Sequence, residues 1–111
     1  MSRECDLARR KAAFLSTFAN PKRLSILQLL LDNEVSVGVL AEQVGLSQSA
    51  TSQHLSRLRD SELIKFRRDA QTVYYAGNSD AVRRIFETLD EIFGAAEHAW
   101  QRNAQAYGGT S

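Results

Sequence analysis

A glycine between two closely spaced helical patterns is the feature that most constrains how this chain can fold. Residues 37–44 place apolar side chains at helical spacing, and Ser36 before them is suited to cap a helix N-terminus. Gly45 follows where a left-handed residue commonly ends a helix, and Ser47 can cap another helix almost at once. Two helices joined by a short turn with glycine predict a helix-turn-helix unit over about residues 36–60.

The second helix of this unit combines a buried side with a polar side that carries few charges. At about 100° per residue, the two sides separate into Ala50, Thr51, His54, Leu55 and Leu58 against Ser49, Ser52, Gln53 and Ser56, with Gln48 and Arg57 at the margins. A solvated helix usually carries more Glu and Lys, which are stronger helix formers than Ser. Ser and Gln exchange hydrogen bonds with base edges, so the polar side indicates DNA reading. The alternative is an ordinary solvated surface.

After this helix the pattern changes from helical to strand-like. Residues 63–68 and 72–76 are rich in β-branched and aromatic side chains, and Asp69-Ala70-Gln71 between them predicts the tip of a two-stranded hairpin. Arg67 and Arg68 near the tip could reach phosphate or a minor groove. The alternative is that these charges protect an exposed strand edge.

Amphipathic helices are predicted at both ends of the chain. The apolar positions of the first, over 7–18, are Leu7, Phe14, Leu15 and Phe18. Asn20-Pro21 then begins a second helix. The last helix begins near Ser79, and its stripe, which can continue through Ala96 and Trp100, is Val82, Ile85, Phe86, Leu89, Ile92 and Phe93. This many large apolar residues on a terminal helix favours self-association, with packing inside one chain as the alternative.

Composition excludes several classes of protein. The chain has 111 residues and a net charge of +1, with basic residues concentrated in 1–31 and 47–77. Its single cysteine excludes an internal disulfide framework and a cysteine-rich zinc module. No apolar run approaches the roughly 20 residues of a membrane span, and the N-terminus has no signal-peptide pattern, so we expect a cytoplasmic protein. The chain also lacks a nucleophile elbow and a phosphate-binding glycine loop, and it is not predicted to be an enzyme.

Four stretches of the chain match motifs that occur in the same order in one known family. They are Phe18–Leu27, Val35–Ala41, Gly45–Leu55 and Arg67–Tyr75. The first resembles the A-x-P-x-R-L-x-I-L opening of the ArsR/SmtB family of bacterial repressors, and the others resemble its third helix, recognition element and wing. The resemblance covers residues 14–93 and is strongest to a branch without an obvious metal site. It implies a mainly α fold with a small β-hairpin (α+β), the winged helix-turn-helix.

The same resemblance implies a homodimer that binds a pseudo-palindromic operator in double-stranded DNA. It implies base or groove contacts from Gln48, Ser49, Ser52 and Gln53. On weaker grounds it implies backbone or wing contacts from Ser47, Ser56, Arg57, Arg67 and Arg68. Joined through helices over about 5–18 and 79–106, the dimer would bury Leu7, Phe14, Val82, Ile85, Phe86, Leu89, Ile92 and Phe93.

The metal sites of this family find few ligands here. The third-helix Cys-x-Cys pair is replaced by Ser36-Val37-Gly38. Asp80 fits the first position of a last-helix site, but Val82 stands where an imidazole is needed. His54 falls on the inward side of its helix and reads as a packing residue. We therefore expect no metal and no cofactor, with a metal-responsive repressor as an alternative.

A thiol switch is the other alternative within the family. Relatives use a pair of cysteines, whereas this chain has only Cys5, which could link two protomers or be inert. We predict one domain over 1–107, a flexible tail over 108–111, and a sequence-specific transcriptional repressor with no known effector. A winged helix used for protein contact, without specific DNA binding, is the alternative from another class.

Overall fold

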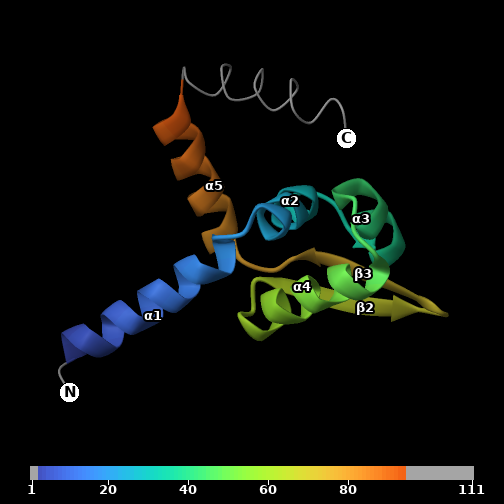
Figure 1. Ribbon diagram of the computed structural model, residues 1–111, viewed down its shortest axis with the longest axis horizontal. Coiled ribbons are helices and arrows are strands. Elements are labelled where there is room, and N and C mark those ends of the chain that lie inside the picture. Colours follow the sequence, from blue (N-terminus) through green and yellow to red (C-terminus); the bar gives the residue numbers. More distant parts are fainter. Residues whose placement is uncertain (1–2, 95–111) are drawn as a thin grey trace.

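The computed structural model describes residues 3–94, which form a helical body with a small antiparallel sheet (Figure 1). In chain order the elements are α1 (Arg3–Phe18), α2 (Pro21–Leu30), β1 (Val35–Ser36), α3 (Val37–Val44), α4 (Gln48–Asp60), β2 (Ile64–Asp69), β3 (Thr72–Gly77) and α5 (Asp80–Phe93). The helices α2, α3 and α4 gather with the sheet, whereas α1 and α5 extend away from this body on one side (Figure 1). The architecture is the predicted winged helix-turn-helix.

Local capping explains where α3 and α4 begin and where α3 ends. Ser36 and Ser47 each accept a backbone N–H from three residues ahead, at 3.4 and 3.1 Å. Gly45 has a left-handed φ of 72°, and the N–H of Leu46 then reaches the carbonyl of Ala41 at 3.0 Å. The predicted helix-turn-helix is confirmed, with its caps at the predicted residues.

The wing has one strand more than we predicted. β2 and β3 pair with Asp69 opposite Thr72, so only Ala70 and Gln71 remain in the turn and the predicted tip was one residue too long. β1 (Val35–Ser36) adds to the other edge of β3, in the sheet order β1-β3-β2. The predicted hairpin of β2 and β3 is confirmed. The additional strand β1 was not predicted, because its two residues carry no strand pattern of their own. Their pairing depends on β3, far along the chain.

The core lies where α2, α3 and α4 meet the sheet. Its most deeply buried apolar side chains are Ile26, Leu27, Leu30, Leu40, Leu55 and Leu58. Gly77, at the end of β3, lies so close to α2 that a Cβ there would be 2.9 Å from the carbonyl oxygen of Leu30. The absence of a side chain at Gly77 therefore lets the sheet approach the end of α2.

The last described helix differs from the prediction at one position of its apolar stripe. Val82 is only 2% exposed and belongs to the core of the single chain, so it offers almost no surface to a second copy. The helix ends at Phe93, where Gly94 N–H donates to the carbonyl of Asp90 at 2.8 Å. The predicted continuation through Ala96 and Trp100, and the predicted tail over 108–111, lie outside the described residues.

Candidate nucleic-acid interface

The two sides of α4 are as different in the structure as in the sequence. Thr51, Leu55 and Leu58 are fully buried against the body, and the buried Thr51 hydroxyl donates to the carbonyl of Ser47 at 2.8 Å. The exposed side carries all the predicted base or groove residues together with two predicted backbone residues: Gln48, Ser49, Ser52, Gln53, Ser56 and Arg57. Packing holds the inner side, so the outer polar groups remain available to a ligand.

The N-terminus of α4 is capped by Ser47, a residue that the sequence analysis predicted to contact DNA. The Oγ of Ser47 accepts the N–H of Ala50 at 3.1 Å, which leaves its hydroxyl hydrogen for an outside acceptor. A Cβ built on Gly38 would lie 3.6 Å from the Nε2 of Gln48, so the beginnings of α3 and α4 are neighbours. Both helices of the unit therefore border this end of the exposed face.

The two wing arginines have different surroundings. Arg67 Nε and NH2 donate to the carboxylate of Glu34 at 2.8 and 2.7 Å, and its guanidinium lies 4.7 Å from the ring centre of Tyr74. Its hydrogen bond to Glu34 raises the pKa of Arg67 above its usual value. Arg68 is exposed on the opposite sheet face, beside Val73, and no ion pair within residues 3–94 engages it. The structure therefore leaves Arg68 more available to phosphate than Arg67.

Sequence reasoning missed two residues that shape this surface. Glu34 was not singled out, because nothing local in the sequence signals its partner 33 positions away. Arg59, in the last turn of α4, lies 4.0 Å over the ring of Phe66 on β2. A cation over an aromatic face is attractive, so this contact ties α4 to the wing. The only sequence signal for this contact was that a basic residue, Arg59, precedes an aromatic residue, Phe66, by seven positions.

Two basic residues of α2 form hydrogen bonds to backbone carbonyls of other helices. Lys22 Nζ donates to the carbonyl of Val44 at the end of α3. Arg23 is 8% exposed and donates to the carbonyls of Ser16 and Thr17 at 3.2 and 2.8 Å. Burial, and then the charge of Arg57, lower the pKa of Arg23 from its usual value. The basic character of the N-terminal third is therefore partly structural.

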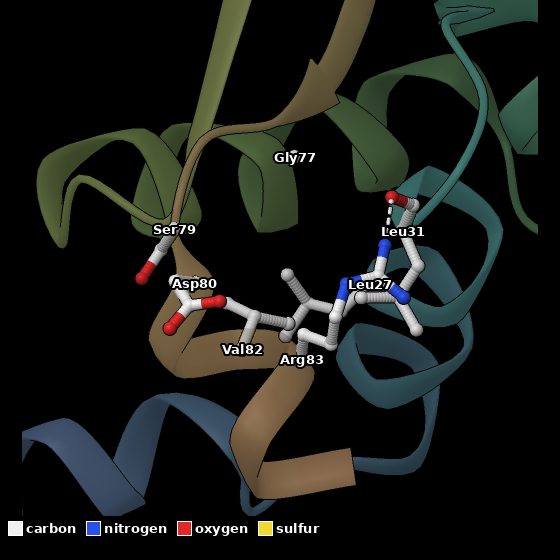
Figure 2. Close-up of a pocket in the computed structure, with 7 residues that line it drawn as sticks. All are labelled: Leu27, Leu31, Gly77, Ser79, Asp80, Val82 and Arg83. Carbon is white, nitrogen blue, oxygen red and sulfur yellow. Dashed lines mark hydrogen bonds between the residues drawn. The ribbon is translucent and has the colours of Figure 1, made fainter. Parts of the chain in front are cut away.

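Two hollows adjoin α2 and α5. The smaller, of about 230 Å³, lies where Arg83 reaches from α5 to the carbonyl of Leu31 at 3.1 Å, with Asp80 and Val82 also lining it (Figure 2). Arg83 also pairs with Asp32 at 2.7 Å, and this hydrogen bond raises the pKa of Arg83. The larger is an open groove of about 940 Å³ between α2, α3 and α5, where Phe86, Leu89 and Phe93 provide apolar surface.

Comparison with known proteins places this geometry in a family. The sequence profile described as "Bacterial regulatory protein, arsR family" matches residues 20–65. The transcriptional activator HlyU of Vibrio cholerae is 45% identical over 84 residues, which are 76% of this chain and 78% of HlyU. This chain belongs to the arsR family. The nodulation protein NolR of Rhizobium meliloti is 59% identical over 83 residues, 75% of this chain and 68% of NolR.

The arsR fold is also found in solved structures. The crystal structure of NolR from Sinorhizobium fredii matches with a TM-score of 0.80 at 55% identity, over 85% of this chain and 95% of that one. The helix-turn-helix and wing described above are therefore those of an arsR regulator. These relatives are transcriptional regulators, which is the class to which this chain belongs.

The sequence predicted that this chain lacks the metal ligands and the cysteine pair that some members of the arsR family use as sensors. Residues 3–94 contain no group of three His, Cys, Asp or Glu side chains placed to hold a metal ion. His54 is half-buried on the inner side of α4, in contact with Arg23, as expected of a packing residue. Cys5 is exposed on α1. In the same part of the chain, no helix is long and apolar enough to cross a membrane.

Proposed function

We propose that this arsR-family regulator reads double-stranded DNA through the exposed face of α4. The observation that carries this proposal is the division of that helix between a buried apolar side and an outer side of short polar groups. Gln48, Ser49, Ser52 and Gln53 are exposed and can donate to and accept from base edges in a major groove. The small size of Ser49 and Ser52 lets the helix backbone approach the bases closely.

Contacts to the DNA backbone would position this reading face. Ser47 and Ser56 present hydroxyl groups, while Arg57 and Arg68 present exposed cations. Arg67 would join them only after leaving Glu34. Backbone contacts carry no sequence information themselves, but they fix orientation and make binding sensitive to salt.

We also propose that the regulator is a homodimer joined through α1 and α5. Both helices extend from the body, and they expose large apolar side chains: Leu7 by 46%, Leu15 by 55%, Ile92 by 69% and Phe93 by 50%. Partly buried Phe14, Ile85, Phe86 and Leu89 add to the same surface. Basic residues predominate on α1 and acidic residues on α5, so a crosswise contact between copies is also favourable in charge.

Such a dimer would present its two α4 helices to half-sites about one helical turn apart, roughly 34–36 Å. We propose that it represses transcription by covering a promoter, in the cytoplasm, by binding alone and without catalysis or a metal effector. One relative is named an activator, so the direction of regulation needs a transcription assay with promoter DNA.

The test is binding of purified protein to its own upstream intergenic DNA and to random DNA. Fluorescence anisotropy at two salt concentrations, with and without chelator and with and without reductant, separates the possibilities. Tight, salt-sensitive and selective binding that chelator leaves unchanged would support the proposal. A change on adding chelator would favour a metal-responsive regulator, and a change on adding reductant would favour a thiol switch. Equal, weak binding to both DNAs would favour a winged helix that binds another protein.

A further inference from the structure

Two consecutive residues in the first turn of α2 hold the ends of two other helices. Lys22 binds the last carbonyl of α3, and Arg23 binds two carbonyls in the last turn of α1. The C-terminal end of a helix carries a partial negative charge, which favours a cation there. Since α1 has no basic residue in its own last turn, Arg23 supplies this cation from the next helix.

Arg23 also reaches the recognition helix. Its NH1 lies 3.4 Å from the Nδ1 of His54, which is half-buried on the inner side of α4. An arginine can only donate, so this contact requires a neutral imidazole with its hydrogen on Nε2. His54 directly follows Gln53, which is exposed on the outer side. A contact that fixes His54 from behind therefore also fixes where Gln53 points.

We propose that Arg23 is a positioning residue for DNA recognition, because through His54 it sets the rotation of α4 relative to α1. The inference rests on the proposed reading face of α4 and adds a residue that touches no DNA. One guanidinium links α1 with the helix that bears the polar face, and in this link Arg23 is buried and His54 is half-buried. Losing the contact should loosen the register of α4 while leaving the rest of the core in place.

Acid should break this contact. The charges acting on His54 are Arg23 from α2 and Arg57 one turn along α4, both positive, while α1 contributes the uncharged carbonyls that Arg23 binds. Burial, Arg23 and Arg57 lower the pKa of His54 from its ordinary 6.5. The unfolded chain then takes up a proton at a higher pH than the folded protein. The contribution of His54 to stability is therefore complete above about 6.5 and declines as pH falls toward the folded pKa.

The experiment uses a duplex that the wild-type protein selects from a random-sequence library, and a scrambled duplex as control. Dissociation constants are measured for wild type, His54→Ala and His54→Asn at pH 7.5 and at lower pH values that extend through the folded pKa of His54, which NMR of the imidazole locates. Asn keeps an acceptor near the position of Nδ1 and does not titrate. At pH 7.5 we expect His54→Ala to lower the ratio of selected to scrambled affinity about fivefold, as for one lost hydrogen bond, and His54→Asn to retain it. As the pH is lowered through the folded pKa of His54, the wild-type ratio should fall while the His54→Asn ratio stays constant.

A double-mutant cycle with Arg23→Lys tests the pair directly. Lysine keeps the charge but not the reach to three acceptors, so His54→Ala should cost little further in that background. Thermal unfolding and sedimentation verify that each variant is folded and assembled. If Arg23→Lys fails to fold, the two His54 variants still decide the question. A ratio unchanged by His54→Ala, or a pH profile shared by wild type and His54→Asn, would overturn this inference alone. If the wild type selects no sequence from the library, both this inference and the proposed reading face of α4 are wrong.

Discussion

Glu34 and Arg67 form a two-contact ion pair between the loop before β1 and the wing. Arg67 Nε donates to Oε2 at 2.8 Å, and NH2 donates to Oε1 at 2.7 Å. The hydrogen bond from Arg67 lowers the pKa of Glu34 below its ordinary 4.5, so the pair is charged at neutral pH. Any phosphate that binds Arg67 must therefore compete with a carboxylate already in place.

This competition predicts unequal effects of the two wing arginines. Arg68→Ala should weaken binding to specific and random DNA alike and reduce the slope of log affinity against log salt by about 1. Arg67→Ala should have a smaller effect on both quantities, because its guanidinium is already neutralised by Glu34. Anisotropy titrations over a range of salt concentrations measure both. Equal losses for the two variants would mean that Arg67 leaves Glu34 when DNA binds.

Removing the competitor should have the opposite sign. Glu34→Gln keeps the shape of the side chain but removes its charge, so Arg67 becomes available to phosphate. We expect tighter binding to both DNAs and a salt slope steeper by up to about 1. Glu34→Gln combined with Arg67→Ala is the control and should lose this gain. If affinity rises equally in the double variant, the effect comes from overall charge.

Base reading by α4 predicts a loss of selectivity without a loss of fold. Gln53→Ala should cost about 1–3 kcal/mol on the specific site and almost nothing on random DNA. The matched control is Gln43→Ala, which makes the same change on α3, in the groove beside α5. Competition binding with both duplexes measures the ratio. A ratio unaffected by Gln53→Ala would remove that residue from the reading face.

The proposed dimer predicts that one charge on α5 separates the copies. Leu89→Glu should sediment as a monomer. Leu89 lines the groove beside α5, and a dimer joined through this surface would have to bury the new carboxylate. Ile92→Glu changes a side chain that is 69% exposed, so it should give a monomer with the fold intact. Val39→Glu, at an exposed apolar residue on α3, is the control and should remain a dimer. An intact dimer for both α5 variants would place the interface elsewhere.

The turn that follows α4 contains a residue whose backbone would suit glycine. Glu62 has a φ of 59°, and the bonds from Glu62 N–H to the carbonyl of Arg59 and from Leu63 N–H to that of Leu58 complete a Schellman motif. Glu62→Gly should therefore raise the free energy of unfolding by about 1 kcal/mol. Glu42→Gly, within α3, should lower it by about 1 kcal/mol. Denaturant titration distinguishes them, and destabilisation by both would contradict the prediction.

The features that could be predicted from the sequence are those set by residues close together in the chain. Ser36, Gly45 and Ser47 act within three or four residues of themselves, so the helix-turn-helix could be placed closely from sequence. The inner and outer sides of α4 follow from helical periodicity in the same way. The stripe on α5 shows the limit of this reasoning, because periodicity identifies apolar residues without saying whether the same chain or a second copy buries them. Val82 is buried by its own chain.

Contacts between distant residues could not be read in this way. β1 exists only because β3 offers it a partner, and Glu34 meets Arg67 across 33 positions. Arg23 and His54 are separated by 31 positions, and each had an adequate local interpretation as a basic or a packing residue. What joins them is the way α2 and α4 pack, which no single stretch of sequence contains.

The capping of other helices by Lys22 and Arg23 has a consequence for how new specificities can arise. The described groups that orient α4 lie behind it or at its two ends, and none of the outer side chains Ser49, Ser52 and Gln53 has a described bonding role in the body. Residues at those positions can therefore be substituted without disturbing the contacts that hold α4 in place. Divergence of operators during evolution, or deliberate reprogramming in the laboratory, can then proceed by substitutions there without redesigning the scaffold.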